Sequence, residues 1–261
     1  MTDILRTHTK VPKNRKWNVR RIVILTGSGI SAESGLHTFR DKGGLWEKYD
    51  LMELATPEAF ARNPARVHEF YNLRRAGLRE VSPNAAHEAL VRLEREFPGD
   101  VFLITQNVDD LHERAGSRTL YHMHGELCKI RCTVCGVVKN WSRELTVTTP
   151  CPACDTSGTL RPHIVWFGEV PFYMTEIEVL LRECDLFLSI GTSGTVYPAA
   201  GFAARAKAGG ARTVELNLEP SQGQGTGREV DQGGLFDEGY YGPATRVVPA
   251  FVDELLKETT E

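Results

Sequence analysis

The spacing of apolar residues along the chain predicts strands that alternate with helices. Short runs rich in β-branched residues, bounded by glycine or polar residues, are typical of buried strands. Such runs occupy residues 21–26, 101–105, 186–190 and 213–218. Stretches with apolar residues at helical spacing lie between them. We therefore expect an α/β fold, with a Rossmann-like parallel sheet that carries helices on both faces.

Helix boundaries can be predicted in some of these stretches. Ser82 and Pro83 resemble an N-cap and the first position of a helix whose apolar stripe ends at Phe97. A second stripe covers residues 177–184, and an alanine-rich helix is expected over residues 197–208. These helices supply the crossovers that a parallel sheet needs.

Two segments interrupt the alternation and predict a smaller second domain. Residues 36–80 are mostly helical, and residues 127–160 hold four clustered cysteines and resemble a zinc ribbon. The expected division is a basic N-terminal tail at 1–20, a larger domain from 21–35, 81–126 and 161–261, and a small domain from 36–80 and 127–160. Residues 220–239 contain six glycines and predict a flexible loop.

Composition and charge narrow the function classes. The 261 residues carry 31 Lys+Arg and 34 Asp+Glu, a net charge of −3, so no general nucleic-acid field is expected. The chain lacks a long apolar run and an apolar leader, so neither a membrane span nor export is expected. We therefore predict a cytoplasmic protein. We also take a monomer as the working expectation. Residues 6–21 hold seven Lys/Arg and no acid; this is a solvated tail or a contact for an acidic partner.

Four of the six cysteines follow the spacing of a metal site. Cys132 and Cys135 form one C-x2-C pair, and Cys151 and Cys154 form a second pair fifteen residues later. This pattern is typical of a tetrahedral zinc site with all four positions filled, hence of a structural ion. Two disulfides are the alternative, which a reducing compartment disfavours.

The first predicted strand leads into a glycine-rich turn. Residues 27–32 read Gly-Ser-Gly-Ile-Ser-Ala and fit the G-x-G-x-x-G/A pattern, in which a tight turn and a following helix bring backbone amides to a pyrophosphate. No second strand ending in an acidic residue follows within about 20 residues, where dehydrogenases usually contact the ribose. A dinucleotide site without simple hydride transfer is therefore predicted.

Segments with small or hydrogen-bonding residues also follow the other predicted strands. They contain Gln106, Asn107, Asp109, Gly191, Thr192, Ser193, Asn217, Leu218 and Glu219. Because the carboxyl ends of parallel strands meet at one edge, we expect a single ligand crevice there. His122 and His124 follow the second strand; either could be a structural residue, and one is a candidate general base.

Taken in order, these motifs resemble the sirtuins, the NAD-dependent protein lysine deacylases, and most closely their bacterial desuccinylase type. The resemblance covers roughly residues 20–252. The turn at 27–31 matches the family's Gly-Ala-Gly-Ile-Ser pattern, with Ser28 in place of alanine, and Thr38 stands where acetyl-selective relatives have Asp. The 106–109 run, the His124-Gly125 pair and the four cysteines also stand in the family's order.

The resemblance implies a role for each matching residue. His124 is the general base, and Asn107 and Asp109 act beside it. The implied NAD contacts are Gly27, Ser28, Gly29, Ile30, Ser31, Ala32, Glu33, Phe39, Arg40, Trp46, Gln106, Asn107, Asp109, Gly191, Thr192, Ser193, Asn217, Leu218, Glu219 and Ala244. The implied substrate strand is Val165, Trp166, Phe167, Gly168 and Glu169.

The acyl group is indicated by a pair in a predicted helix. Tyr71 and Arg74 stand at i and i+3, on one helix face. The pair matches the family's Tyr-x-x-Arg motif for succinyl, malonyl and glutaryl lysine, and Ala55 matches its small residue that leaves room for the longer chain. Without the resemblance, the alternative is that Tyr71 packs in the core and Arg74 forms an ion pair with Glu69 or Glu80.

The implied activity is an NAD-dependent removal of succinyl and malonyl groups, and of acetyl groups, from protein lysines. Nicotinamide and O-acyl-ADP-ribose are its products, and one structural zinc accompanies NAD. Two alternatives stay open: a protein ADP-ribosyltransferase, and a non-catalytic NAD sensor.

Overall fold

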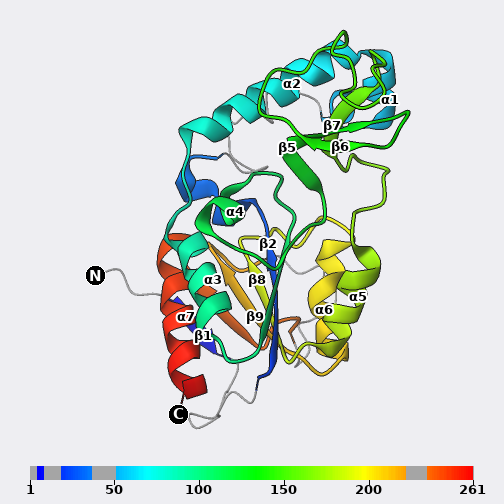
Figure 1. Ribbon diagram of the computed structural model, residues 1–261. Coiled ribbons are helices and arrows are strands. Elements are labelled where there is room, and N and C mark those ends of the chain that lie inside the picture. Colours follow the sequence, from blue (N-terminus) through cyan, green and yellow to red (C-terminus); the bar gives the residue numbers. More distant parts are fainter. Residues whose placement is uncertain (1–4, 9–18, 37–50, 222–233, 261) are drawn as a thin grey trace.

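The computed structural model describes residues 5–8, 19–36, 51–221 and 234–260 (Figure 1). Its larger part is a seven-stranded sheet with the order β1-β10-β9-β8-β2-β3-β4. Only β1 is antiparallel to its neighbour. The strands are β1 Leu5–His8, β2 Arg21–Thr26, β3 Asp100–Thr105, β4 Leu120–His122, β8 Leu186–Ile190, β9 Arg212–Asn217 and β10 Glu238–Tyr241.

The predicted parallel sheet is confirmed, and the four predicted strands are its four central ones, β9-β8-β2-β3. Three outer strands were not predicted. β1 lies inside the segment expected to be a tail, where it pairs with β10. Glu238 and Gly239, at the end of the expected loop, belong to β10 and are buried. Residues 222–233 of that loop lie outside the described residues.

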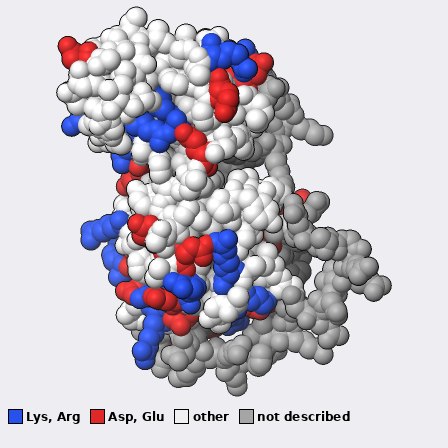
Figure 2. All heavy atoms as spheres, turned by 90° about the vertical axis from the view of Figure 1, so that its right-hand side faces the viewer, with Lys and Arg blue, Asp and Glu red and all other residues white. Residues whose placement is uncertain are grey.

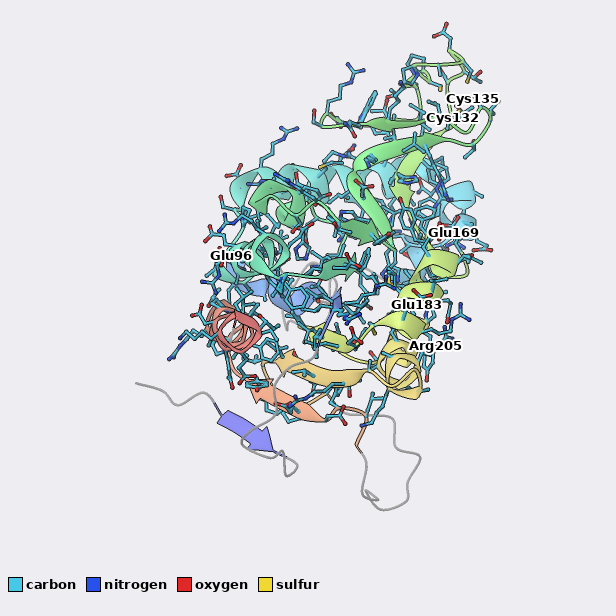
Figure 3. All side chains as sticks on the ribbon, turned by 60° about the horizontal axis from the view of Figure 1, so that its bottom comes forward. Glu96, Cys132, Cys135, Glu169, Glu183 and Arg205 are labelled. Carbon is cyan, nitrogen blue, oxygen red and sulfur yellow. The ribbon has the colours of Figure 1, made fainter. Side chains whose placement is uncertain are left out.

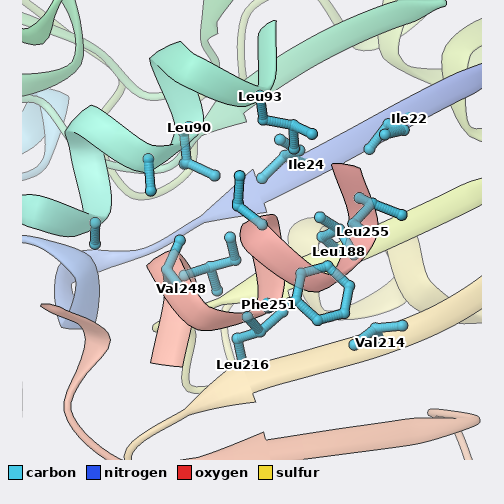
Figure 4. Packing of buried hydrophobic residues seen from close by; sticks show 14 of the residues in the cluster. Ile22, Ile24, Leu90, Leu93, Leu188, Val214, Leu216, Val248, Phe251 and Leu255 are labelled. Carbon is cyan, nitrogen blue, oxygen red and sulfur yellow. The ribbon is translucent and has the colours of Figure 1, made fainter. Parts of the chain in front are cut away.

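Helices cover both faces of the sheet (Figure 1). The helices α3 Ala85–Glu96 and α7 Ala244–Thr260 lie on one face, and α5 Met174–Glu183 and α6 Phe202–Ala208 on the other. Successive strand residues point to opposite faces. On β2, Ile22 and Ile24 therefore join the core under α3 and α7 (Figure 4). Val23 and Leu25 join the core under α5 and α6.

Two helix starts differ from the sequence prediction. The helix α3 begins at Ala85, because Asn84 and not Ser82 is its N-cap. The Asn84 side chain accepts a hydrogen bond from the Ala86 amide (2.9 Å), and its Nδ2 donates to the Ile30 carbonyl (2.9 Å). The third predicted helix starts with a 3-10 turn, η5 (Ala199–Gly201), before α6.

The smaller part combines a three-stranded antiparallel sheet with two helices. Its strands are β5 Gly125–Cys132, β6 Val138–Asn140 and β7 Leu160–Ile164, and its helices are α1 Pro57–Arg62 and α2 Pro64–Gly77. The helix α2 begins at Pro64, because Asn63 caps it by accepting a hydrogen bond from the Arg66 amide (3.1 Å). The sheet also takes in residues 125–126 and 161–164, which the sequence division placed in the larger domain.

The described surface carries charges of both signs. On the face shown in Figure 2, Lys/Arg and Asp/Glu side chains lie interspersed over the larger part. None of the helices in the described ranges is both long and apolar enough to cross a bilayer.

Candidate active site

A cleft of about 1470 Å³ runs along the carboxyl edge of the large sheet and under the smaller part. Every described residue that the sequence assigned to cofactor or substrate lines this cleft, except Ile30. Ile30 is fully buried in the core under α3 and α7. Phe39, Arg40 and Trp46 lie outside the described residues. The single crevice predicted from the strand ends is thus a feature of the structure.

The glycine-rich turn after β2 packs directly against the turn after β8. The Gly29 amide donates to the Gly191 carbonyl (2.9 Å), and a Cβ on Gly29 would lie 2.7 Å from the Gly191 Cα. Only glycine fits such an approach. The predicted helix after this turn is wrong: two 3-10 turns, Ser28–Ile30 and Ala32–Ser34, follow instead and end at Gly35, whose φ is 98°.

Ser31 is the centre of a buried hydrogen-bond cluster beside this turn. Its hydroxyl donates to Asp109 Oδ2 (3.1 Å) and accepts from Asn107 Nδ2 (3.2 Å). The other Asp109 oxygen accepts from the Leu111 amide (3.1 Å). Burial raises the pKa of Asp109 above its ordinary value. We call Gly27–Ser31 and Gln106–Asp109 the cofactor end of the cleft.

The two candidate histidines have different surroundings. His122 is buried, and its Nε2 lies 2.7 Å from Glu113 Oε1. Burial disfavours its charge, but the Glu113 hydrogen bond and charge outweigh burial and raise the pKa of His122. His122 does not line the cleft, whereas His124 does.

The His124 ring is held in one orientation by the backbone carbonyl of Gln106. Its Nδ1 lies 3.1 Å from the Gln106 carbonyl, to which it can only donate. Nε2 is therefore the nitrogen with the lone pair. Burial lowers the pKa of His124, partly opposed by the Gln106 carbonyl. A histidine that is neutral near pH 7 and has a free lone pair suits a general base.

The opposite end of the cleft is formed by α2 and the segment after β7. Tyr71 is 1% exposed, and its hydroxyl accepts from Trp166 Nε1 (2.9 Å). The guanidinium carbon of Arg74 lies 5.8 Å from the centre of the Tyr71 ring. Ala55 lies on the same wall, because its carbonyl accepts from the Phe167 amide (2.9 Å). We call Ala55, Tyr71, Arg74 and Trp166 the acyl end.

Residues 165–169 were expected to form a strand and do not. β7 ends at Ile164, and the chain then turns, with the Glu169 amide bonded to the Trp166 carbonyl (3.0 Å). The Glu169 carboxylate accepts from the Trp166 amide (2.8 Å) and pairs with Arg161 (2.7 Å) and Arg131 (2.9 Å). Glu169 therefore holds the turn in shape.

Sequence reasoning missed Arg161. Its guanidinium carbon lies 3.4 Å from the centre of the Trp166 ring, so it supports the acyl end from behind. An Arg-Pro-His run in a half-polar strand gives no local sign of this role.

The four spaced cysteines form one cluster away from the cleft. Their sulfurs lie within 4.8 Å of one another, at the outer end of the small sheet (Figure 3). The Cys132–Cys154 and Cys135–Cys151 sulfur distances are 3.8 and 3.7 Å. These match the ~3.8 Å edge of a tetrahedron of sulfurs around zinc and exceed a disulfide bond of about 2.04 Å. The cluster therefore fits one structural zinc.

Comparisons with known proteins agree with this geometry. Residues 27–198 match the Sir2 family. An NAD-dependent protein deacylase of Caulobacter vibrioides is 55% identical over 241 residues, 91% of this chain and 98% of that protein. A Sir2 homologue solved with NAD has a TM-score of 0.80 at 36% identity, covering 93% of this chain and 91% of that one. A Sir2 protein bound to a myristoylated histone peptide has a TM-score of 0.68 at 30% identity, covering 93% and 94%.

Proposed function

This chain belongs to the Sir2 family and is an NAD-dependent protein deacylase, and we propose that it prefers lysine acyl groups that end in a carboxylate. Succinyl and malonyl lysine are the preferred substrates, and acetyl lysine is a weaker one. The proposal is supported by the Tyr71–Arg74 pair, which lines the acyl end of the cleft.

The acyl end combines a cation with apolar walls. The Tyr71 hydroxyl oxygen accepts a hydrogen bond from the Trp166 indole N–H, so the hydroxyl proton of Tyr71 is available to a carboxylate in the cleft. The Arg74 guanidinium lies beside the Phe70 and Tyr71 rings and is half-buried. A guanidinium can grip a carboxylate through two parallel hydrogen bonds, and low polarity around it strengthens that contact. A neutral acetyl group has no such partner.

At the cofactor end, the chain supplies a preformed frame. The backbone of Gly27–Ala32 would receive the pyrophosphate, with Gly191–Ser193, Asn217–Glu219 and Ala244 on the adenosine side. Asn217 Nδ2 donates to the Thr192 carbonyl (2.8 Å), which joins two of these turns. The Glu33 carboxylate accepts from the Thr245 amide (2.9 Å), so this side chain anchors the start of α7.

The reacting groups are assigned to three residues. NAD, when bound, would supply a ribose that loses nicotinamide and takes over the acyl group from the lysine; one water is consumed, and free lysine, nicotinamide and O-acyl-ADP-ribose are the products. Asn107 and Asp109, fixed by Ser31, would orient the ribose and shape the pocket for the leaving ring. His124 would take a proton from a ribose hydroxyl at its Nε2.

The substrate is an acyl-lysine in a peptide or protein segment. Two Sir2 structural relatives are described with peptides, one a myristoylated histone peptide and one a deacetylated p53 peptide. The cleft passes under the turn at 165–169, where a peptide backbone could reach the acyl end. We further propose a cytoplasmic location, because the four thiols of the zinc cluster need a reducing compartment.

The Arg74→Met variant tests the proposed acyl preference. Methionine keeps much of the apolar length of the side chain and removes the charge. A charge-assisted hydrogen-bonded pair contributes about 1.5–3 kcal/mol, so kcat/KM for a succinyl-lysine peptide should fall by about 10- to 150-fold. The same peptide with acetyl-lysine should lose less than about threefold. Equal losses on both peptides would make Arg74 a structural residue and contradict the proposal.

A further inference from the structure

His112 is a buried polar residue that the proposed mechanism does not use. It lies on the short helix α4 (Leu111–Ala115), is 1% exposed and does not line the cleft. Its Nε2 lies 3.0 Å from Thr26 Oγ1. The Thr26 hydroxyl in turn donates to Thr105 Oγ1 (2.8 Å). Since a hydroxyl has one proton, Thr26 must accept from His112, and the histidine proton is therefore on Nε2.

This chain of hydrogen bonds continues into the cofactor end. Thr105 Oγ1 accepts from the backbone amide of Asn107 (3.0 Å). The Asn107 side chain bonds to Ser31, and Ser31 bonds to Asp109. Because Thr26 ends β2 and Thr105 ends β3, the chain also joins the two strands from which the cofactor end emerges.

The chemical state of His112 is fixed by its surroundings. Burial lowers the pKa of His112 well below its ordinary value, and the nearby His87 and His122 lower it further. The His87 ring lies 4.9 Å away, edge to face. Within the described parts of the chain, Nδ1 has no hydrogen-bond partner, and a buried polar atom in that state costs free energy. The ring acts as a neutral donor through Nε2 alone.

We propose that His112 is a positioning residue, which fixes Asn107 through Thr26 and Thr105 for the step that releases nicotinamide. The step named here rests on the proposed function, whereas the chain of hydrogen bonds does not. A histidine that only filled the core would stabilise the fold without holding Asn107. The two roles therefore differ in whether a variant changes kcat and the hydrogen exchange of the Asn107 amide.

The test uses His112→Leu, which removes the donor, and Thr26→Val, which removes the hydroxyl at nearly constant volume. Thr26→Ser restores the hydroxyl. Thr213→Val is the matched control, since Thr213 is a fully buried strand threonine whose hydroxyl bonds to the Leu235 carbonyl (2.9 Å) away from the cleft. Turnover of a succinyl-lysine peptide and hydrogen–deuterium exchange over residues 105–111 are measured for each variant.

His112→Leu and Thr26→Val should each lower kcat about 10- to 100-fold, with KM for the peptide changed less than about threefold. The double variant should be no slower than the slower single variant, because both break one chain. Exchange at the Asn107 amide should become at least about tenfold faster in these variants and stay unchanged in Thr26→Ser and Thr213→Val.

Three results would overturn the inference: losses in kcat that multiply in the double variant, kcat within twofold of wild type in folded Thr26→Val, or unchanged exchange at Asn107. If His112→Leu does not fold, Thr26→Val alone tests the inference. The exchange measurement needs no turnover. An inactive wild-type protein would therefore contradict the proposed function, whereas unchanged exchange in the variants contradicts the role of His112.

Discussion

The two ends of the cleft are built in opposite ways. At the cofactor end, polar side chains bond mainly to one another: Asn107 to Ser31, and Ser31 to Asp109. These residues stand on the turns that follow strands of the large sheet. At the acyl end, Tyr71 and Arg74 stand on helix α2, outside the sheet; the Tyr71 hydroxyl accepts a hydrogen bond from Trp166, and the Arg74 guanidinium lies beside the Tyr71 ring.

This difference separates chemistry from selectivity. The groups assigned to the reaction follow β2, β3 and β4, which are neighbouring strands of one sheet. The groups assigned to acyl recognition lie on one helix, which β5, Trp166 and the Arg75–Leu127 hydrogen bond (3.0 Å) hold in place. A change of Tyr71 or Arg74 should therefore alter the acyl preference more than it alters the hydrogen-bond frame of the cofactor end, although the Asp109 charge acts on the Arg74 guanidinium.

The largest effect should come from His124→Ala, because it removes the assigned base. Turnover should fall by about 1,000-fold, within the range of roughly 10²–10⁴ that a positioned base contributes. Succinyl and acetyl peptides should lose the same factor, since His124 belongs to the end that both share. NAD affinity, measured by calorimetry, should change little. A loss confined to succinyl peptides would show that the two ends are not separate.

The sequence predicted the features that depend on near neighbours. The run at 21–26 is rich in β-branched residues, residues 27–32 carry the glycine pattern of a tight turn, and the spacing of the four cysteines brings their sulfurs together. The shared face of Tyr71 and Arg74 follows from the periodicity of one helix, and Asn63 and Pro64 mark the start of that helix.

The features that the sequence did not show depend on distant partners. β4 and β10 have three and four residues, and they are strands because β3 and β9 offer them an edge. The Tyr71–Trp166 hydrogen bond joins residues 95 positions apart, and the His112–Thr26 bond joins residues 86 apart. Asn84 replaced Ser82 as N-cap because its side chain also ties α3 to Ile30 and Ser34.

A smaller effect is expected from pH. His124 must be neutral to accept a proton, and burial lowers its pKa below 6.5. Activity should therefore be constant above about pH 7 and fall to half at a pH below 6.5, as protonation removes the base. The midpoint should be the same for succinyl and acetyl peptides, because neither acyl group titrates in that range. A midpoint above 6.5, or one that differs between the two peptides, would contradict this assignment.

The most direct test of the account compares two peptides that differ only in charge. One carries succinyl-lysine, and the other carries the same group with its terminal carboxylate converted to the amide, which keeps its size. With wild-type protein, NAD and zinc, nicotinamide release should give a kcat/KM about 10- to 100-fold higher for the carboxylate than for the amide. Equal values for the two peptides would contradict recognition of the acyl group by charge at Arg74.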